Sequence, residues 1–301
     1  MSAIDQILAR SLPLVPKPIV RRVSRRYIAG DTLREAVQTV RELNGFGLMA
    51  TLDVLGESVT DRSLVEAAAR EYEEALRAII QARLDSNLSV KPTQFGMKID
   101  FDLCLAKIRG LARQAREAGS FLRLDMEDSS CTSPTLDLYR RLAPECPGAV
   151  GVVLQAYMRR SLNDVKELPD QANVRLCKGI YIEPPEIAYR DRALVNKNFV
   201  HLLEALLDRG AYVGIATHDE ELVWEAYRII ERRQLAPASY EFQMLLGVAE
   251  PLRRRIRGDG HRLRVYVPFG AHWYAYSLRR LKENPRIAGY ILSSLFRPRT
   301  S

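Results

Sequence analysis

Two adjacent arginines near the end of the chain form the first group of residues that predicts chemistry. Arg279 and Arg280 lie in the segment Ala271–Glu283, which is rich in helix formers and follows a strand-like run, Leu263–Val267, that Pro268 ends. A helix here places four side chains on one face: Tyr276, Arg279, Arg280 and Glu283. Paired guanidinium groups just after a strand bind a carboxylate or a phosphate through two parallel hydrogen bonds. The alternative is a solvated, charged face of a surface helix.

Polar residues also follow or close most of the other apolar runs in the chain. They are Lys91, Asp125 with Glu127, Gln155, Lys178 and Tyr181, Thr217-His218-Asp219, Gln243 and Tyr266. Each by itself is most simply a cap or a loop residue, but the pattern recurs after seven successive runs. Catalytic side chains in barrel enzymes come from the carboxyl ends of several strands.

The absence of several motifs from the sequence excludes some classes of enzyme. The sequence contains no HExxH motif, no Cys/His cluster and no G-x-S-x-G motif, so we predict neither a metal site nor a serine hydrolase. Lys91 and Lys178 are candidates for a Schiff-base lysine. A basic, aromatic site without metal is equally consistent with an organic cofactor held by Arg, Lys and His side chains.

The elements that position these residues alternate strand and helix. We count eight strand–helix units, which predict a (β/α)₈ barrel, because parallel strands need crossover helices. A doubly wound open sheet is the alternative, although no GxGxxG motif follows any strand. The predicted strands are 48–54, 87–91, 121–125, 149–155, 173–177, 212–217, 239–244 and 263–267. The predicted helices are 60–84, 101–118, 133–142, one around Leu162, 187–209, 220–233, a short one after Gly247, and 271–283.

Alternation along the fifth predicted strand predicts the direction of the Arg175 side chain. Val174 and Leu176 share one face, so Arg175 points to the other, which is the barrel interior if the apolar pair faces the helices. A buried guanidinium needs an anionic or acceptor-rich partner. In the third strand Arg123 and Asp125 share a direction, so those two residues are candidates to pair with each other.

The ends of the chain differ from this repeating region. We divide the chain into an N-terminal helical extension (1–45), the barrel (46–285) and a C-terminal tail (286–301). Residues 19–29 are basic and amphipathic, which suits either a helix packed on the barrel or a contact with an anionic membrane surface. No apolar run approaches the length of a transmembrane helix, and four scattered cysteines suit a reducing, cytoplasmic location. The basic segment near residue 22 is a candidate for peripheral contact with the inner membrane. The net charge of +8 suits an anionic ligand, but no basic stripe interleaved with aromatic residues indicates nucleic-acid binding.

Taken in order, these motifs resemble the proline dehydrogenase family, in its monofunctional bacterial form. The resemblance rests on one ordered set: Asp125, Gln155, Arg175-x-x-Lys178-Gly179-x-Tyr181, Ala216-Thr217-His218-Asp219 and Arg279-Arg280-x-x-Glu283. It implies a distorted (β/α)₈ barrel with the last helix over the barrel mouth. It also implies FAD-dependent oxidation of L-proline to Δ1-pyrroline-5-carboxylate by hydride transfer to FAD N5, with electrons then passed to a membrane quinone.

The resemblance also implies roles for individual residues. Lys91, Arg279 and Arg280 would bind the proline carboxylate, Asp125 would organise Tyr266 or an arginine, and the substrate ring would lie among Tyr181, Leu245 and Tyr266. FAD would contact Met126, Gln155, Arg175, Lys178, Gly179, Ile180, Thr217, His218, Asp219, Gln243, Arg280 and Glu283. The chain departs from the family pattern at Ile180 and Ile182, where relatives often carry a small residue and an aromatic that stacks on adenine. The alternatives are a flavin barrel of the methylenetetrahydrofolate reductase type and a Schiff-base lyase that uses Lys178 or Lys91.

Overall fold

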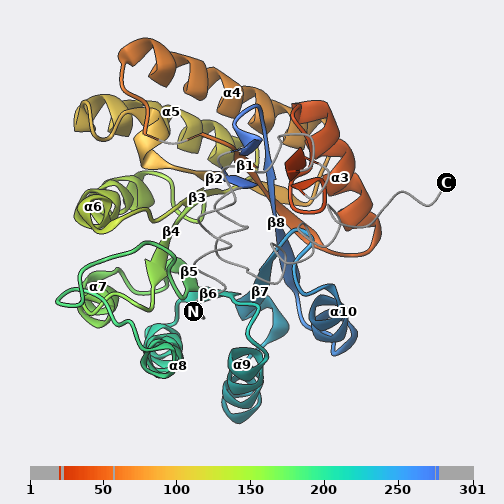
Figure 1. Ribbon diagram of the computed structural model, residues 1–301, viewed down its shortest axis with the longest axis vertical. Helices are drawn as coiled ribbons and strands as arrows, with labels where there is room; N and C mark the ends of the chain where they lie inside the picture. The colour runs from red at the N-terminus through yellow and green to blue at the C-terminus, as the bar shows by residue number, and fades with distance from the viewer. Residues whose placement is uncertain (1–19, 22–23, 57, 275, 278–301) are drawn as a thin grey trace, which may run out of the picture.

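Eight parallel strands close into a barrel in which each strand pairs with the next along the chain and β8 pairs with β1 (Figure 1). This is the architecture of a computed structural model that describes residues 20–21, 24–56, 58–274 and 276–277. The strands are β1 (Met49–Val54), β2 (Ser86–Val90), β3 (Leu122–Leu124), β4 (Val150–Gln155), β5 (Asn173–Cys177), β6 (Tyr212–Ala216), β7 (Tyr240–Leu245) and β8 (Leu263–Phe269). The predicted (β/α)₈ barrel is confirmed, and the open sheet is excluded by the pairing of β8 with β1.

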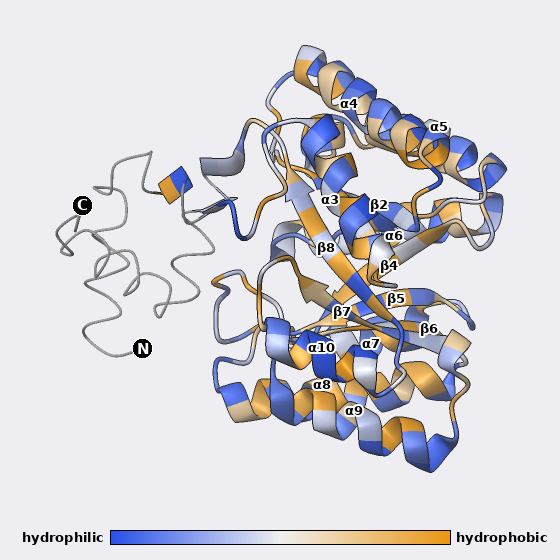
Figure 2. Ribbon diagram, turned by 90° about the vertical axis from the view of Figure 1, so that its right-hand side faces the viewer, coloured by the Kyte–Doolittle hydropathy of each residue, from blue (hydrophilic) through white to orange (hydrophobic). Residues whose placement is uncertain are grey.

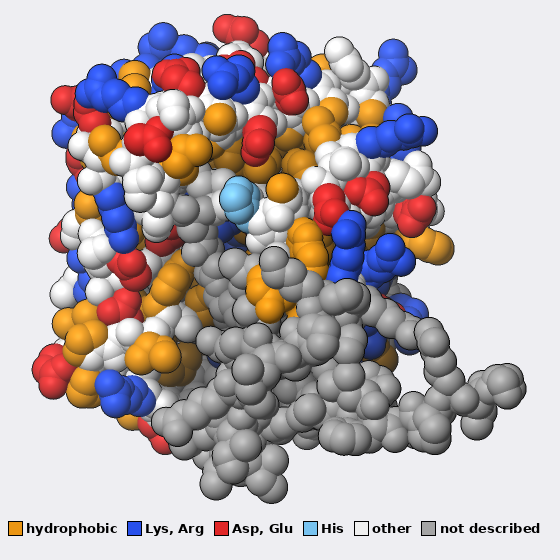
Figure 3. Space-filling view, turned by 45° about the horizontal axis from the view of Figure 1, so that its top comes forward, with side chains coloured by type: hydrophobic (Ala, Val, Ile, Leu, Met, Phe, Trp, Pro, Cys, Tyr) orange, Lys and Arg blue, Asp and Glu red, His pale blue; other side chains and the backbone are white. Residues whose placement is uncertain are grey.

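Helices surround the barrel, and all of those described except α3, which precedes β1, connect successive strands. They are α3 (Leu33–Gly45), α4 (Arg62–Gln81), α5 (Phe101–Glu117), α6 (Ser129–Glu145), α7 (Ser161–Glu167), α8 (Arg192–Asp208), α9 (Glu220–Arg233) and α10 (Glu250–Gly258). Most of them start at an aspartate whose side chain accepts backbone N–H groups, as Asp61 does for α4 and Asp100 for α5. On the shell the helices mix hydrophilic and hydrophobic residues (Figure 2), and acidic and basic side chains are interspersed on the face shown in Figure 3.

Several predicted boundaries were wrong, and the largest errors fall at the starts of two helices. Helix α6 begins at Ser129 rather than Ser133, because Asp128 accepts from the Ser130 backbone N–H and caps the helix four residues earlier. Helix α8 begins at Arg192 rather than Ile187, capped by Asp191. Strand β8 runs through Pro268 to Phe269, because Pro268 pairs in register with Asp53 of β1.

Strand alternation separates an apolar outer face from a polar interior. Residues such as Leu88 and Val90 of β2 are fully buried among apolar neighbours and belong to the main core between barrel and helices. The alternate positions carry polar side chains that bond across the lumen, such as Arg264 of β8 to Asn87 of β2 (Nη1–Oδ1 2.9 Å). The interior of this barrel is therefore a hydrogen-bonded network of charged and amide groups.

The segment before α3 packs against the barrel. Val20, Ser24 and Ile28 are buried at four-residue spacing, whereas Arg21 and Arg25 are exposed. Ile28 clusters with Leu55 and Tyr276, and the backbone continues this contact through Ala29 N–H to Pro268 O at 2.9 Å. For the described residues of this segment, the structure therefore supports the packed-helix interpretation.

Candidate active site at the mouth of the barrel

Arg175 lies at the centre of the site and reaches three other strands. Its Nε donates to Oε1 of Gln243 on β7 at 2.5 Å, and its Nη1 donates to Oδ1 of Asp125 after β3 at 2.7 Å and to Ser89 Oγ on β2 at 3.1 Å. The predicted inward direction of Arg175 is confirmed. Its side chain is only 8% exposed, so these acceptors replace the water that the guanidinium would otherwise bind.

Asp125 joins this arginine to Tyr266. The Tyr266 hydroxyl donates to Oδ2 of Asp125 at 2.9 Å, Ser89 Oγ donates to Oδ1 at 2.7 Å, and the Arg175 guanidinium lies 5.3 Å from the centre of the Tyr266 ring. Burial, reinforced by the charge of Asp125, raises the pKa of Tyr266 well above its usual value. Tyr266 is therefore a neutral phenol with its hydroxyl direction set by Asp125.

The suggested pairing of Arg123 with Asp125 was wrong. Arg123 instead donates to the backbone oxygens of Val152 (3.0 Å) and Asn173 (2.8 Å) and to the Asn173 side chain. Gly151 makes room for it, since a Cβ there would lie 2.5 Å from Arg123 Nη1. Arg123 in β3 and Asp125 just after that strand therefore bond in different layers of the barrel.

Lys91 forms a buried ion pair with Asp53, the inward residue near the end of β1. Asp53 is fully buried, and its Oδ2 has no hydrogen-bond partner among the residues that the structure describes. Burial raises the pKa of Asp53, and the charge of Lys91 opposes that shift. Our sequence analysis did not select Asp53 as a site residue, although its alternation with Leu52 and Val54 signals an inward carboxylate.

A second group of charges lies at the ends of β5 and β6. Lys178 Nζ is 2.5 Å from Oδ2 of Asp219, and Arg192 Nη2 is 2.9 Å from the same oxygen. Partial burial would raise the pKa of Asp219, but hydrogen bonds from Lys178 and Arg192 hold that pKa well below its usual value. Nearby, the Leu245 backbone N–H donates to Nε2 of His218 at 2.8 Å, so that ring nitrogen is an acceptor.

The ends of β3 and β4 are linked through Gln155. Its Nε2 donates to the backbone oxygen of Glu127 at 2.9 Å, and the Glu127 carboxylate accepts the N–H and hydroxyl of Thr93. Met126 is buried beside Glu127. Thr217 is also buried, and its hydroxyl accepts the Asp219 backbone N–H at 3.1 Å.

The loop after β5 depends on a glycine. Gly179 has φ +101°, and a Cβ there would lie 2.0 Å from the ring of Tyr157. The loop then carries Tyr181 in a half-buried position, whereas Ile180 and Ile182 are exposed. Glu183 anchors the loop to α6 by accepting the Ser129 N–H and hydroxyl, each at 2.7 Å.

Part of the predicted site lies outside the described residues. Arg279, Arg280 and Glu283 fall there, so the predicted guanidinium clamp stays a prediction. Within the described ranges, no group of three or more His, Cys, Asp or Glu side chains is arranged to hold a metal. No helix in the same ranges is long and apolar enough to cross a bilayer.

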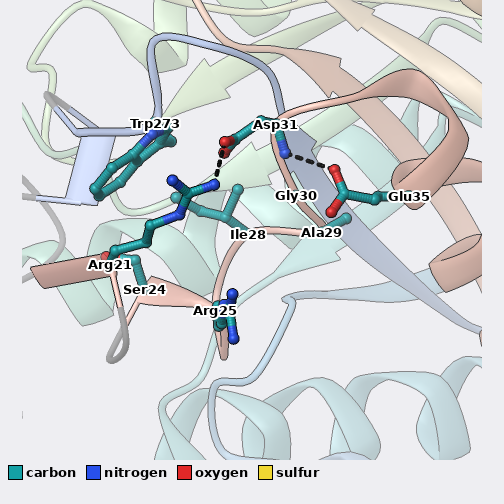
Figure 4. Close-up of a pocket in the computed structure, with 9 residues that line it drawn as sticks. All are labelled: Arg21, Ser24, Arg25, Ile28, Ala29, Gly30, Asp31, Glu35 and Trp273. Atoms are coloured by element: carbon teal, nitrogen blue, oxygen red, sulfur yellow. Dashed lines mark hydrogen bonds and ion pairs between the residues drawn. The ribbon is translucent and has the colours of Figure 1, made fainter. Parts of the chain in front are cut away.

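A separate pocket of about 280 Å³ lies beside the N-terminal segment (Figure 4). Arg21 crosses it between Asp31, which it binds at 2.5 Å, and the ring of Trp273, whose centre is 5.7 Å from the guanidinium carbon. Glu35 accepts the Asp31 backbone N–H at 3.0 Å on the far side. Most of the polar groups drawn in Figure 4 bond to one another. Because Arg21 belongs to the N-terminal segment and Trp273 follows β8, the pocket lies between these two parts of the chain.

The fold and the position of the polar side chains define the class of protein: a (β/α)₈ barrel with its candidate active site at the carboxyl ends of the strands. A family model described as proline dehydrogenase matches residues 36–291. The chain belongs to the proline dehydrogenase family, whose members are oxidoreductases of proline catabolism. This confirms the resemblance drawn from the ordered motifs.

Individual relatives agree with this assignment. Proline dehydrogenase 1 of Bacillus subtilis subsp. natto is 35% identical over 275 residues, which cover 91% of each chain. Proline dehydrogenase of Deinococcus radiodurans is 34% identical over 308 residues, 98% of this chain and 99% of that one. The crystal structure of proline utilization A from Bdellovibrio bacteriovorus, inactivated by N-propargylglycine, superposes with a TM-score of 0.82 at 26% identity. That match covers 88% of this chain but only about a third (33%) of the Bdellovibrio chain.

Proposed function

We propose that this protein oxidises L-proline to Δ1-pyrroline-5-carboxylate with bound FAD and passes the electrons to a membrane quinone. One observation carries the proposal beyond family membership: Lys91, Asp125, Arg175, Gln243 and Tyr266 come from five strands and converge at the mouth and upper lumen of the barrel. Three of them form a continuous hydrogen-bonded chain from Gln243 through Arg175 to Asp125.

The donors at the mouth suit a flavin. Arg175 makes no hydrogen bond through Nη2 within the described part of the chain, so this group is available to an acceptor on a ligand. When bound, FAD supplies a two-electron oxidant that accepts hydride at N5. We assign its contacts to Met126, Gln155, Arg175, Lys178, Gly179, Ile180, Thr217, His218, Asp219, Gln243, Arg280 and Glu283. With Ile182 almost fully exposed (99%), the chain offers no aromatic there for the adenine.

The substrate side of the site is cationic. Oxidation needs proline as a free amine, because the nitrogen lone pair forms the C=N bond of the product. Lys91, Arg279 and Arg280 would bind the carboxylate, and their positive field lowers the pKa of the amine. Tyr181, Leu245 and Tyr266 would enclose the ring. Asp125 already accepts from Ser89, Arg175 and Tyr266, so we assign it the orientation of Tyr266 rather than proton transfer.

The decisive experiment is a visible spectrum of the purified protein. We expect a flavin band that bleaches on anaerobic addition of L-proline and returns when a quinone analogue is added. A colourless protein, or a flavin band that L-proline leaves unchanged, would contradict the proposal. Reduction by NAD(P)H with folate turnover would instead indicate an enzyme of the methylenetetrahydrofolate reductase type.

A Schiff-base lyase is the less favoured function on structural grounds. Lys91 is paired with Asp53 and Lys178 with Asp219, and an ion pair opposes the neutral amine that a Schiff base requires. Borohydride treatment with substrate should therefore leave the protein mass unchanged. Covalent trapping on either lysine would reverse this ranking.

We further propose a cytoplasmic protein that contacts the inner membrane through its N-terminal extension (1–45), ahead of the catalytic barrel (46–285) and the tail (286–301). Exposed Arg25 and the exposed Arg21 against Trp273 support this surface, because cationic and aromatic side chains suit an anionic bilayer interface. Co-sedimentation with vesicles containing anionic lipid should fall for Arg25→Glu. The same charge change at Arg77, which is exposed on α4, serves as the control and should have no effect.

A further inference from the structure

Glu241 lies on the inner face of β7, in the layer below the candidate active site. It is 2% exposed and binds Arg264 through both carboxylate oxygens (2.7 and 3.1 Å), and its Oε2 also accepts the Tyr212 hydroxyl at 2.8 Å. Its Oε1 accepts Nε2 of Gln243 at 2.6 Å. This carboxylate therefore touches a side chain that binds Arg175.

The Gln243 amide bonds to the Glu241 carboxylate, an anion, and to the Arg175 guanidinium, a cation. A carboxylate only accepts hydrogen bonds, so Gln243 must turn its nitrogen toward Glu241. A guanidinium only donates, so the same amide must turn its oxygen toward Arg175 Nε, 2.5 Å away. Glu241 below thus determines which end of the amide Arg175 meets above.

Burial would raise the pKa of Glu241, but the charge and hydrogen bonds of Arg264 lower it to about 2. The carboxylate is therefore an acceptor throughout the neutral range. Gly214 of β6 leaves room for the amide, since a Cβ there would lie 2.4 Å from Gln243 Nε2. The charges of Glu241 and Arg175 therefore fix the orientation of the Gln243 amide, and Gly214 leaves the space that the amide occupies.

We propose that Glu241 is a positioning residue: by orienting the Gln243 amide, it directs the Arg175 guanidinium so that Nη1 meets Asp125 and Nη2 faces the ligand site. The inference rests on the proposed function for its kinetic consequence, but not for its structural one. Glu241, which lies outside the candidate site, thus sets the direction of the Arg175 guanidinium at the centre of that site.

The first test replaces Glu241 by Gln. We expect the new amide to place its oxygen at the Oε2 position, where it still accepts from Arg264 Nη2 and the Tyr212 hydroxyl, so that its nitrogen replaces Oε1 beside Gln243 Nε2. The Gln243 amide then inverts and presents a donor to Arg175 Nε. We expect kcat/KM for L-proline to fall about ten- to hundredfold, as for a buried donor left without its acceptor, together with a shifted absorption band of the bound flavin.

A double variant distinguishes positioning from general damage. In Glu241→Gln/Gln243→Glu the polarity is exchanged, so that Glu at 243 accepts from the amide below and from Arg175 above. We expect this variant to recover most of the loss. Tyr212→Phe is the matched control, because it removes a hydrogen bond from the other carboxylate oxygen and leaves the Gln243 contact intact; it should retain the wild-type spectrum and kcat/KM within about twofold.

Gly214→Ala tests the same contact without changing any charge, and it decides the matter if Glu241→Gln does not fold. Its added methyl group displaces the Gln243 amide, and we expect the same direction of change. Wild-type kinetics and spectrum in either single variant, or no recovery in the double variant, would overturn the proposal.

A crystal structure of Glu241→Gln separates this inference from the proposed function. An altered Gln243–Arg175 contact supports the positioning role even if the wild-type protein proves not to oxidise L-proline. An unchanged contact refutes the role, whatever the protein catalyses.

Discussion

Arg175 of β5 crosses the lumen to bind Asp125 after β3, with Nη1 2.7 Å from Oδ1. The two residues are 50 positions apart in the chain and both side chains are nearly buried, at 8% and 12% exposure. Their ion pair joins the flavin side of the proposed site to Tyr266 on its substrate side.

Removing one partner of this pair should destabilise the fold strongly. We expect Asp125→Ala to lower the free energy of unfolding by about 3–5 kcal/mol, because Arg175 is left as an uncompensated buried charge. Urea denaturation measures this loss. The control is Glu220→Ala, which breaks an exposed pair with Arg255 (76% and 69% exposed) and should cost less than about 1 kcal/mol. Equal effects of the two substitutions would contradict the assignment.

Lys91→Met should weaken substrate binding more than it slows turnover. Its ammonium is proposed to bind the proline carboxylate, so we expect KM for L-proline to rise about tenfold or more with a smaller change in kcat. Steady-state kinetics with an artificial electron acceptor provide the measurement. Lys98→Met removes a lysine that pairs with Asp128 on the surface, and it should leave KM unchanged. A Lys91 variant with unaltered KM would exclude the carboxylate contact.

Gly179→Ala should disturb the loop that follows β5. Alanine is strained at φ +101°, and its Cβ would overlap the Tyr157 ring, so we expect a loss of about 2 kcal/mol or more and weaker FAD binding. Gly110→Ala is the matched control. Gly110 lies within α5 with nothing within 4 Å of an added Cβ, so that substitution should stabilise the protein by about 0.5–1 kcal/mol. The idea fails if both substitutions change stability alike.

Asp219 should make stability depend on acid pH. Its pKa is depressed in the folded protein by Lys178 and Arg192, so the folded state binds fewer protons than the unfolded state at this group. The stabilisation is complete above the unfolded pKa of about 3.9 and is lost as the pH falls below it. Wild type should therefore be more stable than Asp219→Asn at pH 7, and the difference should shrink as the pH falls through 4. A pH-independent difference would mean that Asp219 acts through packing alone.

The resemblance drawn from the ordered motifs placed the chain in its family, and strand–helix alternation predicted the barrel. These features are local: apolar positions two apart determine which face of a strand meets the helices, so Arg175 had to point inward. Boundaries were less certain, because the caps at Asp128 and Asp191 compete with nearby turn and proline signals.

The partners of the inward residues were decided only by the tertiary structure. Arg123 and Asp125 point the same way from one strand, yet the first binds Asn173 and the second binds Arg175 and Tyr266. Asp53 and Glu241 carried the same inward alternation but gave no sign of which charge each would meet. Alternation is a property of a single strand, whereas a contact across the lumen depends on the closure and stagger of all eight.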